Sequence, residues 1–330
     1  MTPLADEITT LTHNTGFSGV VSVDRAGTTE FAGAYGLAHR GLGVPNTVDT
    51  RFMIASGTKG FTALTVMGLV ADGGLTLDTT ARSVLGKDLP LVDDTVTVEH
   101  LLGHRSGIGE FYPDQAPITD YNMPGRPQDL LHTEQYLPIL DGHPQVFEPG
   151  SRFEYSNSGY VLLGLIAERV SGIPFHDLVV ERVCAPAGMP DTAFHRLDTP
   201  ESRMALGYLE IDGEWRTNVY HLPIRGAGDG GIFTTVADFA RFWPALFDGA
   251  IVPKDTVANM IRVHSEVPEE KMAYGLGFWL RGSSVLLEGY DPGVSFRSVH
   301  TPETGLTYTV ISNTADGAWP ITRRLAEVLD

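Results

Sequence analysis

Residues 56–71 read SGTKGFTALTVMGLVA, and this stretch decides the fold that we expect for the chain. Apolar side chains occupy nearly every side of it until Asp72-Gly73-Gly74 ends the run, which predicts a helix sunk in a core. Ser56 and Lys59 would lie on one face at the start of that helix. Burial disfavours the charged form of an amine, and such an amine can help to remove the proton of a serine hydroxyl. The stretch therefore predicts acyl transfer through a covalent serine intermediate, although a surface lysine near a helix start is the simpler alternative.

Bulk properties narrow the class of partner. The chain has 330 residues and a formal net charge of −18 at pH 7. A surface of that sign repels nucleic acid and anionic membranes, so we expect neither as a partner. The single cysteine, Cys184, excludes an internal disulfide, and its apolar neighbours indicate a small buried side chain rather than a nucleophile.

Targeting signals are not visible in the sequence. The N-terminal stretch MTPLADE has neither a basic nor an apolar segment typical of a secretory signal. No apolar run approaches the roughly 18 residues of a membrane span. As written, the chain is expected to stay in the cytoplasm; a protein trimmed of its signal would look the same and would be exported.

Strand and helix patterns are concentrated at the two ends of the chain. Residues 3–14 predict a short helix and 18–24 with 28–35 a hairpin around a Gly-containing turn. Near the C-terminus we expect four strands and a closing helix, at residues 274–280, 284–288, 294–299, 306–312 and 318–329. Helices and loops are expected to dominate from about residue 97 to 220. Within them, the proline- and aromatic-rich region 111–149 has the composition of loops that line a substrate cleft.

Two further groups of polar residues are candidates for a site. Tyr155 and Asn157 alternate on an extended or turning segment, so both could face one side, and a phenol beside an amine can relay a proton. The alternative is a tyrosine packed at a helix entrance, with Ser156 or Asn157 as the cap. His100 and His104 stand four residues apart, but no third ligand follows, and we expect a structural turn and no metal.

The order and spacing of three motifs resemble those of the penicillin-recognising serine hydrolases. The motifs are Ser56-x-x-Lys59, the run LLGHRSG at 101–107 and Tyr155-Ser156-Asn157. The likeness is to the branch that holds class C β-lactamases, DD-peptidases, D-amino-acid amidases and β-lactamase-like esterases. The glycine-rich segment 226–238 is similar to one that precedes a helix in that branch.

The resemblance implies an α+β fold of the β-lactamase/transpeptidase type. An antiparallel sheet of N- and C-terminal strands would be flanked by helices and joined by a mainly helical insertion. The expected division is residues 1–70 with 225–330 for the sheet domain and 71–224 for the helical domain, with the site in the cleft between them. No cofactor is implied. The match of Gly226-x-Gly228-x-x-Gly231 to a dinucleotide fingerprint lacks the preceding strand of a βαβ unit.

The resemblance also implies roles for individual residues. Ser56, Lys59 and Tyr155 would be catalytic, and Asn157 would bind substrate or hold Lys59. The family's third motif, Lys-Thr-Gly or His-x-Gly, would correspond to residues 289–293, with Tyr290 in place of the cationic group and Pro292 in place of the glycine. Tyr290, Asp291 and Gly293 would then contact substrate, and the N–H groups of Ser56 and Gly293 would form the oxyanion hole. His300-Thr301-Pro302 is a weaker alternative for this motif.

The loss of the usual third motif shifts the expected substrate. Lysine or histidine there often helps to hold a substrate carboxylate, so we expect an esterase, amidase or peptidase acting on a small molecule. A β-lactamase or DD-carboxypeptidase and a non-catalytic ligand-binding descendant are the alternatives. Substrate identity and oligomeric state stay open.

Overall fold

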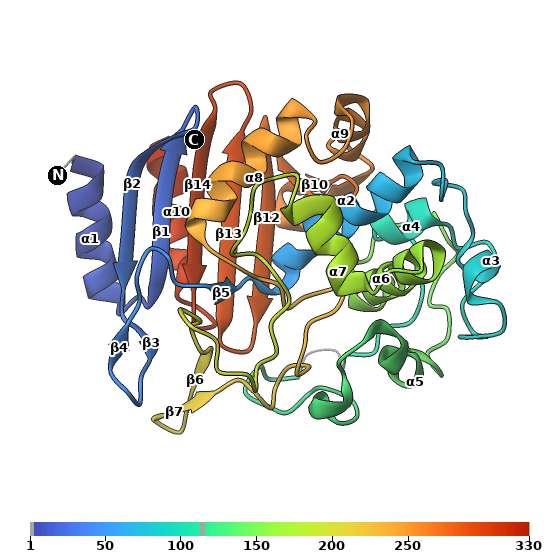
Figure 1. The fold of residues 1–330 in the computed structure, drawn as a ribbon, viewed down its shortest axis with the longest axis horizontal. Helices are drawn as coiled ribbons and strands as arrows, with labels where there is room; N and C mark the ends of the chain where they lie inside the picture. Colours follow the sequence, from blue (N-terminus) through green and yellow to red (C-terminus); the bar gives the residue numbers. More distant parts are fainter. Residues whose placement is uncertain (1–2, 113–115, 330) are drawn as a thin grey trace.

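The computed structural model describes residues 3–112 and 116–329 (Figure 1). Three sequence predictions extend outside these ranges: the domain division, which includes residues 1–2, 113–115 and 330, and the two that follow. Met1 and Thr2 belong to the stretch examined for a signal, and residues 113–115 belong to the expected cleft region. The remaining predictions fall on described residues.

An antiparallel sheet of eight described strands forms the centre of the molecule, in the order β2-β1-β14-β13-β12-β11-β10-β9. Strands from both ends of the chain meet within it, since Val21 in β1 pairs with Val310 in β14. The fold predicted from the sequence is confirmed. The strands are β1 (Gly19–Arg25), β2 (Thr28–Tyr35), β9 (Ser265–Val267), β10 (Met272–Tyr274), β11 (Trp279–Arg281), β12 (Ser284–Asp291), β13 (Val294–Thr301) and β14 (Leu306–Ser312).

One strand prediction was wrong. Residues 274–280 were expected to form a single strand, but the chain turns back between β10 and β11, where Ala273 pairs with Leu280. Gly277 in this turn has φ of +91°, a conformation that side-chain-bearing residues rarely adopt. A turn, not an extended segment, therefore occupies the middle of the predicted strand.

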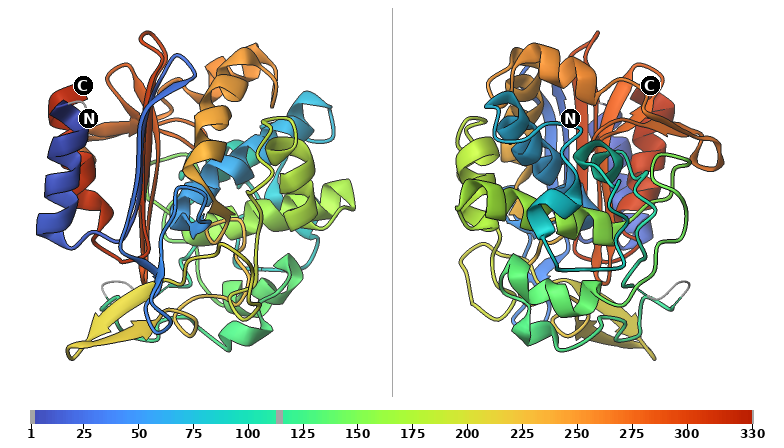
Figure 2. Two further views of the ribbon diagram at one scale, coloured as in Figure 1. Left: turned by 60° about the vertical axis from the view of Figure 1, so that its left-hand side comes forward. Right: turned by 90° about the vertical axis from the view of Figure 1, so that its right-hand side faces the viewer.

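Helices cover the two faces of the sheet unequally (Figure 2). The predicted terminal helices α1 and α10 pack on one face, where Ile8 and Ile321 share a cluster with Val21 and Tyr308. The remaining helices lie over the other face. The helices are α1 (Pro3–Thr15), α2 (Thr58–Ala71), α3 (Ala81–Leu85), α4 (Val98–Leu102), α5 (Leu137–Leu140), α6 (Asn157–Ser171), α7 (Phe175–Val179), α8 (Val236–Asp248), α9 (Lys254–Met260) and α10 (Ala318–Leu329).

Short elements complete the chain. A hairpin of β6 and β7 interrupts the region where only helices and loops were expected, and its tip carries the exposed Asp212-Gly213 turn. The two-stranded pairs are β3 (Leu37–His39) with β4 (Val44–Pro45), β5 (Phe52–Met53) with β8 (Phe233–Thr234), and β6 (Tyr208–Ile211) with β7 (Glu214–Thr217). The tighter or wider helical turns are η1 (Ala55–Gly57), η2 (Pro127–Asp129), η3 (Thr133–Tyr136), η4 (Val180–Cys184) and η5 (Pro268–Glu270).

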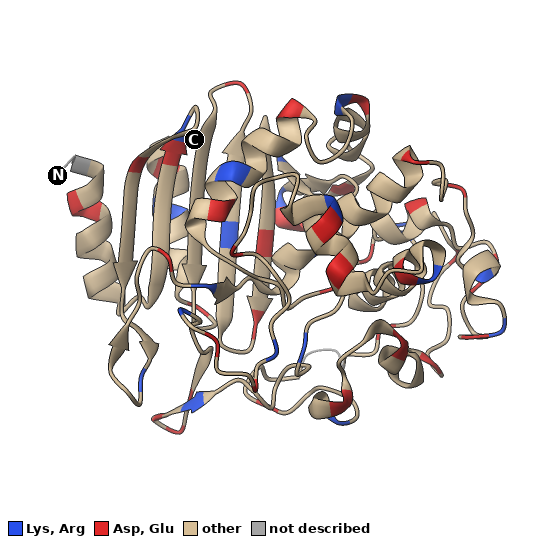
Figure 3. Ribbon diagram, in the orientation of Figure 1, with Lys and Arg blue, Asp and Glu red and all other residues tan. Residues whose placement is uncertain are grey.

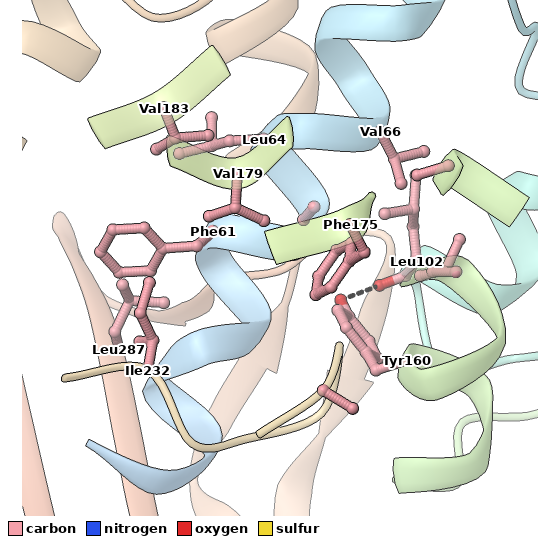
Figure 4. Packing of buried hydrophobic residues seen from close by; sticks show 14 of the residues in the cluster. Phe61, Leu64, Val66, Leu102, Tyr160, Phe175, Val179, Val183, Ile232 and Leu287 are labelled. Atoms are coloured by element: carbon pink, nitrogen blue, oxygen red, sulfur yellow. Dashed lines mark hydrogen bonds between the residues drawn. The ribbon is translucent and has the colours of Figure 1, made fainter. Parts of the chain in front are cut away.

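Helix α2 is buried along most of its length, as its apolar sequence predicted. Phe61 and Leu64 are fully inaccessible and pack among residues from α7, η4 and β12 (Figure 4). Phe61 stacks on Phe242 of α8 with ring centroids 5.1 Å apart. Burying a side chain of this size contributes about 1.5–3 kcal/mol, so the core fixes the position of α2 and of the turn before it.

Helix α6 lies beside α2 and begins at a side-chain cap. Ser156 Oγ accepts the N–H of Gly159 at 3.0 Å, which confirms Ser156 as the cap. One turn further on, the Tyr160 hydroxyl donates to the Leu102 carbonyl at 2.8 Å (Figure 4). This bond ties the N-terminal part of α6 to the end of α4, while α6 also packs against α2.

The 41 acidic and 23 basic residues are spread over helices, strands and loops (Figure 3). In the described part of the chain, no helix combines the length and the apolar character that a membrane span requires. The division into domains at residues 70 and 225 stays a prediction.

Candidate active site

Ser56 lies in the η1 turn that leads into α2. The Ile54 N–H donates to the Ile232 carbonyl at 3.1 Å, and the Gly57 N–H donates to the Ile54 carbonyl at 2.9 Å. Ala55, with φ of +48°, adopts a left-handed conformation that costs energy for a residue with a side chain. This strained turn places Ser56, which is partly exposed, at the mouth of a buried helix.

Lys59 is buried next to Ser56, with 2% of its surface exposed. Its Nζ donates to Ser56 Oγ at 3.0 Å, to Asn157 Oδ1 at 2.8 Å and to the Asp229 carbonyl oxygen at 2.7 Å. A lysine ammonium has three donors, and all three are used here. Asn157 therefore holds Lys59, one of the two roles expected for it.

Tyr155 comes from the segment before α6 and stands over the same amine. Lys59 Nζ lies 4.8 Å from the centroid of the Tyr155 ring, and the ring stacks on His104 at 4.3 Å. Among the described residues, no hydrogen-bond partner is found for the Tyr155 hydroxyl. The structure thus brings Ser56, Lys59, Tyr155 and Asn157 together, with the hydroxyl of Tyr155 left for another partner.

His104 supports this arrangement from behind. Its Nδ1 accepts the N–H of Ser156 at 3.0 Å, as expected of a structural histidine. Burial, together with the charge of Lys59, holds the pKa of His104 well below its usual value, so the ring is neutral and can accept this bond. His100 accepts the N–H of Thr97 in a helix cap, so both histidines have structural contacts.

Glu110 is a site residue that sequence reasoning missed. Its Oε2 accepts the N–H of Asn157 at 2.6 Å and that of Ser158 at 3.2 Å, at the start of α6. A carboxylate at a helix N-terminus is favoured by the helix dipole and by the free N–H groups there. No sequence pattern signals this contact, because Glu110 reaches α6 from 47 residues away along the chain.

Ser56 stands between two cavities. An inner cavity of about 290 Å³ is lined by Ser56, Tyr155 and Asn157, and Tyr112, Ile118 and Asp120 form part of its wall. The first part of region 111–149 thus contributes to the cleft, through Tyr112 and described residues between 116 and 122. An outer, more open cavity of about 500 Å³ is lined by Ser56, Tyr155 and Trp279.

The third motif lies in a different register from the one predicted. A Cβ on Gly289 would lie 2.1 Å from the Ile54 carbonyl oxygen, so only glycine allows β12 to approach the Ser56 turn this closely. Gly289, not position 292, is therefore where this strand requires a glycine next to the Ser56 turn. The residue two places before it is Leu287, which packs in the core against Gly60 of α2 and offers neither a cation nor an imidazole.

Two other predictions for this segment change with the register. Gly293 was expected in the oxyanion hole, but it packs against Gly207 and Tyr208 and lines a separate cavity without Ser56. That prediction was wrong. Tyr290 lines both cavities next to Ser56. Its ring lies 6.1 Å from that of Trp319 in α10, so the tyrosine does not take the place of the motif's cationic group. The alternative residue His300 is buried on β13 and stacks on Trp243.

Asp229 and Asp291 give the inner cavity a carboxylate wall. Burial raises the pKa of Asp229 to about 6, an effect that the Lys59 charge opposes. Burial, and then the charge of Asp229, raises the pKa of Asp291 to about 7. Asp291 was among the expected substrate contacts, and the structure places it in the cavity; Asp229 was not expected, although it stands in the glycine-rich segment quoted for the resemblance.

Cys184 is buried, and burial raises the pKa of its thiol to about 12, so this thiol is not a nucleophile.

Comparison with known proteins agrees with this geometry. A penicillin-binding protein from Bacillus halodurans superposes with a TM-score of 0.91 at 32% identity, over 98% of this chain and all of that one. A D-amino acid amidase from Ochrobactrum anthropi SV3 superposes with a TM-score of 0.81 at 28% identity, over 98% of each chain. Esterase EstB from Burkholderia gladioli is 36% identical over 197 residues, 57% of this chain and 49% of the esterase. The sequence model described as Beta-lactamase matches residues 4–329, and the chain therefore belongs to the beta-lactamase family.

Proposed function

We propose that the protein is a serine hydrolase that cleaves an ester, amide or peptide of a small molecule through an acyl intermediate on Ser56. The observation that carries the proposal is the position of Lys59 Nζ, 3.0 Å from Ser56 Oγ at the edge of a cavity. Asn157 and the Asp229 carbonyl take its other two donors and fix the amine in place. A protein that only bound ligands would not require a buried amine held against a hydroxyl.

The reaction follows from this arrangement. Ser56 Oγ attacks the substrate carbonyl while its proton passes to the Lys59–Tyr155 pair, and the proton then goes to the leaving alcohol or amine as the bond to it breaks. Either a neutral amine or a phenolate can accept this proton. Whichever of Lys59 and Tyr155 lacks the proton therefore acts as the base. Water, activated in the same way, releases the acyl group.

The oxyanion hole is proposed to use the N–H groups of Ser56 and Tyr290. Asp291 and Val294 form the pair that closes the two-residue loop after β12. Hydrogen-bonded and non-hydrogen-bonded pairs alternate along an antiparallel ladder, so the next residue, Tyr290, makes no backbone hydrogen bond to β13. Its N–H then points to the other edge of β12. Strand β11 pairs with β12 only as far as Leu286, so this edge is free beside the Ser56 turn. Donors held in place before the reaction are the usual means of stabilising a developing oxyanion.

The lining of the site favours some substrates over others. Among the described residues, neither cavity next to Ser56 is lined by lysine or arginine. Leu287, two places before Gly289, is a buried apolar residue that cannot bind a substrate carboxylate. The chemistry therefore supports neutral or cationic esters, amides or peptides. The named esterase and amidase relatives support the same class, whereas a β-lactamase or DD-carboxypeptidase would have to bind an anionic substrate here.

The site also supports the proposed domain division. Ser56 and Asp291 come from the two ends of the chain and Tyr155 from its middle, as expected of a cleft between residues 1–70 with 225–330 and residues 71–224.

Intact-mass analysis tests the proposal. Wild type and Ser56→Ala are incubated with p-nitrophenyl acetate and, separately, with a fluorescent penicillin. We expect an acetyl adduct and turnover of the ester in the wild type only. Equal turnover by Ser56→Ala would overturn the proposal, and a stable penicilloyl adduct would instead favour the penicillin-binding alternative. No adduct and no turnover with either probe would favour a binding protein.

A further inference from the structure

The inner cavity contains two carboxylates for which the proposed reaction has no use. Asp229 and Asp291 line the same cavity as Ser56. Asp291 Oδ2 also lies close to the residue after Asp229, at 3.5 Å from the position that a Cβ on Gly230 would occupy. Both residues therefore border the space where the substrate has to sit. Their position relative to Ser56 makes them part of the substrate site rather than of the distant surface.

Neither carboxylate is paired with a cation. Within the described ranges, no hydrogen bond or ion pair is found for the Asp291 side chain, and Asp229 accepts only from the N–H groups of Asp229 and Gly230. Lys59 is near, but all three of its donors are taken by other oxygens. Two carboxylates in a poorly solvated space repel each other, and a cation between them would relieve this cost.

Three other carboxylates with little exposed surface have cationic partners. Asp191 pairs with Arg51 and Arg203, and Asp238 pairs with Arg241. Glu288, on the outer side of Ser56, pairs with Arg297. Asp291 differs from these three, because among the described residues no hydrogen bond or ion pair is found for its side chain.

From this geometry we infer that the site selects substrates that carry an ammonium group close to the scissile carbonyl, bound by Asp291 and Asp229. The inference rests on the proposed function and narrows it to amino esters, amino-acid amides or peptides with a free amine. A charge-assisted hydrogen bond from the ammonium group to Asp291 would also fix the position of the carbonyl relative to Ser56. Anionic acyl groups would be excluded by repulsion.

A competition experiment tests the inference. Hydrolysis of p-nitrophenyl acetate reports on Ser56, and leucinamide, N-acetyl-leucinamide and N-succinyl-leucinamide, each in D and L form, are added as competitors at pH 7. A competitor that binds or acylates the site slows the reporter reaction. We expect at least one enantiomer of leucinamide to act at roughly 10- to 100-fold lower concentration than its acetylated form, the range of a hydrogen bond to a charged group, and the succinyl form to be weakest.

Variants then test whether Asp291 and Asp229 cause the preference for the free amine. In Asp291→Asn and Asp229→Asn, the ratio between acetylated and free amide should fall at least several-fold, whereas Glu303→Gln, an exposed carboxylate in the β13–β14 turn, should keep it. Thermal melting of each variant shows whether it is folded. Equal inhibition by free and acetylated amide in the wild type, or an unchanged ratio in Asp291→Asn, would refute the inference and leave the proposed function standing. Reporter hydrolysis that persists in Ser56→Ala, or that is absent from the wild type, would refute the proposed function itself.

Discussion

The two walls of the inner cavity differ in how their polar groups are satisfied. On the wall formed by α2 and α6, the Lys59 amine, the Asn157 carbonyl and the backbone at the start of α6 all have partners at 2.6–3.0 Å. On the wall formed by β12 and the glycine-rich segment, no partner from another side chain is found among residues 3–112 and 116–329 for the carboxylates of Asp229 and Asp291. Apart from the Tyr155 hydroxyl, the polar groups of the first wall have partners without substrate, whereas the carboxylates of the second have no side-chain partner among those residues.

The difference separates two kinds of functional residue. A hydrogen-bonded network positions groups whose geometry must be fixed before the reaction, and breaking it costs both structure and activity. An unpaired carboxylate in a cavity is a cost in the free protein that a ligand can relieve. Substitutions on the first wall should therefore impair catalysis, whereas those on the second should change selectivity and raise stability.

The largest effect is expected from Ser56→Ala. Removing the nucleophile should lower kcat/KM for an activated ester by about 10⁴-fold or more, because the other groups have no bond to form with the acyl carbon. Steady-state hydrolysis of p-nitrophenyl acetate, with intact mass of the trapped enzyme, measures it. A loss of less than tenfold would mean that Ser56 is not the nucleophile.

Lys59→Met tests whether the hydrogen-bonded wall formed by α2 and α6 depends on the lysine amine. The side chain has a similar length but removes the base and leaves the Asn157 and Asp229 oxygens without their donor. We expect kcat to fall about 10²- to 10⁴-fold, with a lower melting temperature. Rates are compared with Lys254→Met on the solvent-exposed start of α9, which should match the wild type. Activity within threefold of wild type in Lys59→Met would contradict the role given to the amine.

Glu110→Gln weakens the same wall from outside the cavity. The amide keeps one acceptor oxygen but loses the charge that faces the N-terminus of α6. We expect a loss of about 1–2 kcal/mol in the free energy of unfolding and a lower kcat, because Asn157 shifts. Urea denaturation and kcat measured on one preparation give both values. A lower stability with unchanged kcat would make Glu110 a structural cap only.

The smallest effect is expected on the other wall and has the opposite sign. The pKa of Asp291 is about 7 in the folded protein, well above its unfolded value, because of burial and of the charge of Asp229. The folded chain therefore binds this proton more tightly, and the ionised group destabilises the fold increasingly as pH rises through 7. Lys59, Tyr112 and Glu110 also face the pair.

Asp291→Asn should consequently raise the melting temperature at pH 8, by about 2 °C for each 1 kcal/mol of repulsion removed, and less at pH 5. Differential scanning fluorimetry at the two pH values measures the difference, and Glu303→Gln controls for the change in net charge. A stabilisation that is equal at both pH values, or a lower melting temperature at pH 8, would show that Asp291 already has a partner in the free protein.

Local pattern predicted a good part of this molecule. The apolar run 60–71 predicted a buried helix, and the patterns near both ends predicted strands, because each periodicity indicates which face is buried. That the strands from the two ends share one sheet was implied by the family resemblance. The spacing of Ser56 and Lys59 is itself a contact, since residues three apart meet on a helix. Tyr155 and Asn157 were identified by resemblance, and their approach to Lys59 is a property of the folded chain.

Contacts between distant segments could not be read in the same way. The register of β12 depends on how closely Gly289 approaches the Ile54 carbonyl, and Gly293, which looked equivalent in sequence, faces Gly207 instead. Glu110 reaches α6 and Asp229 reaches Asp291 without any spacing that announces it. Short-range geometry, set by the backbone, fixed the helix and its serine–lysine pair from the sequence alone. Long-range packing decided which carboxylates share the cavity, because burial and electrostatic repulsion arise only when the chain has folded.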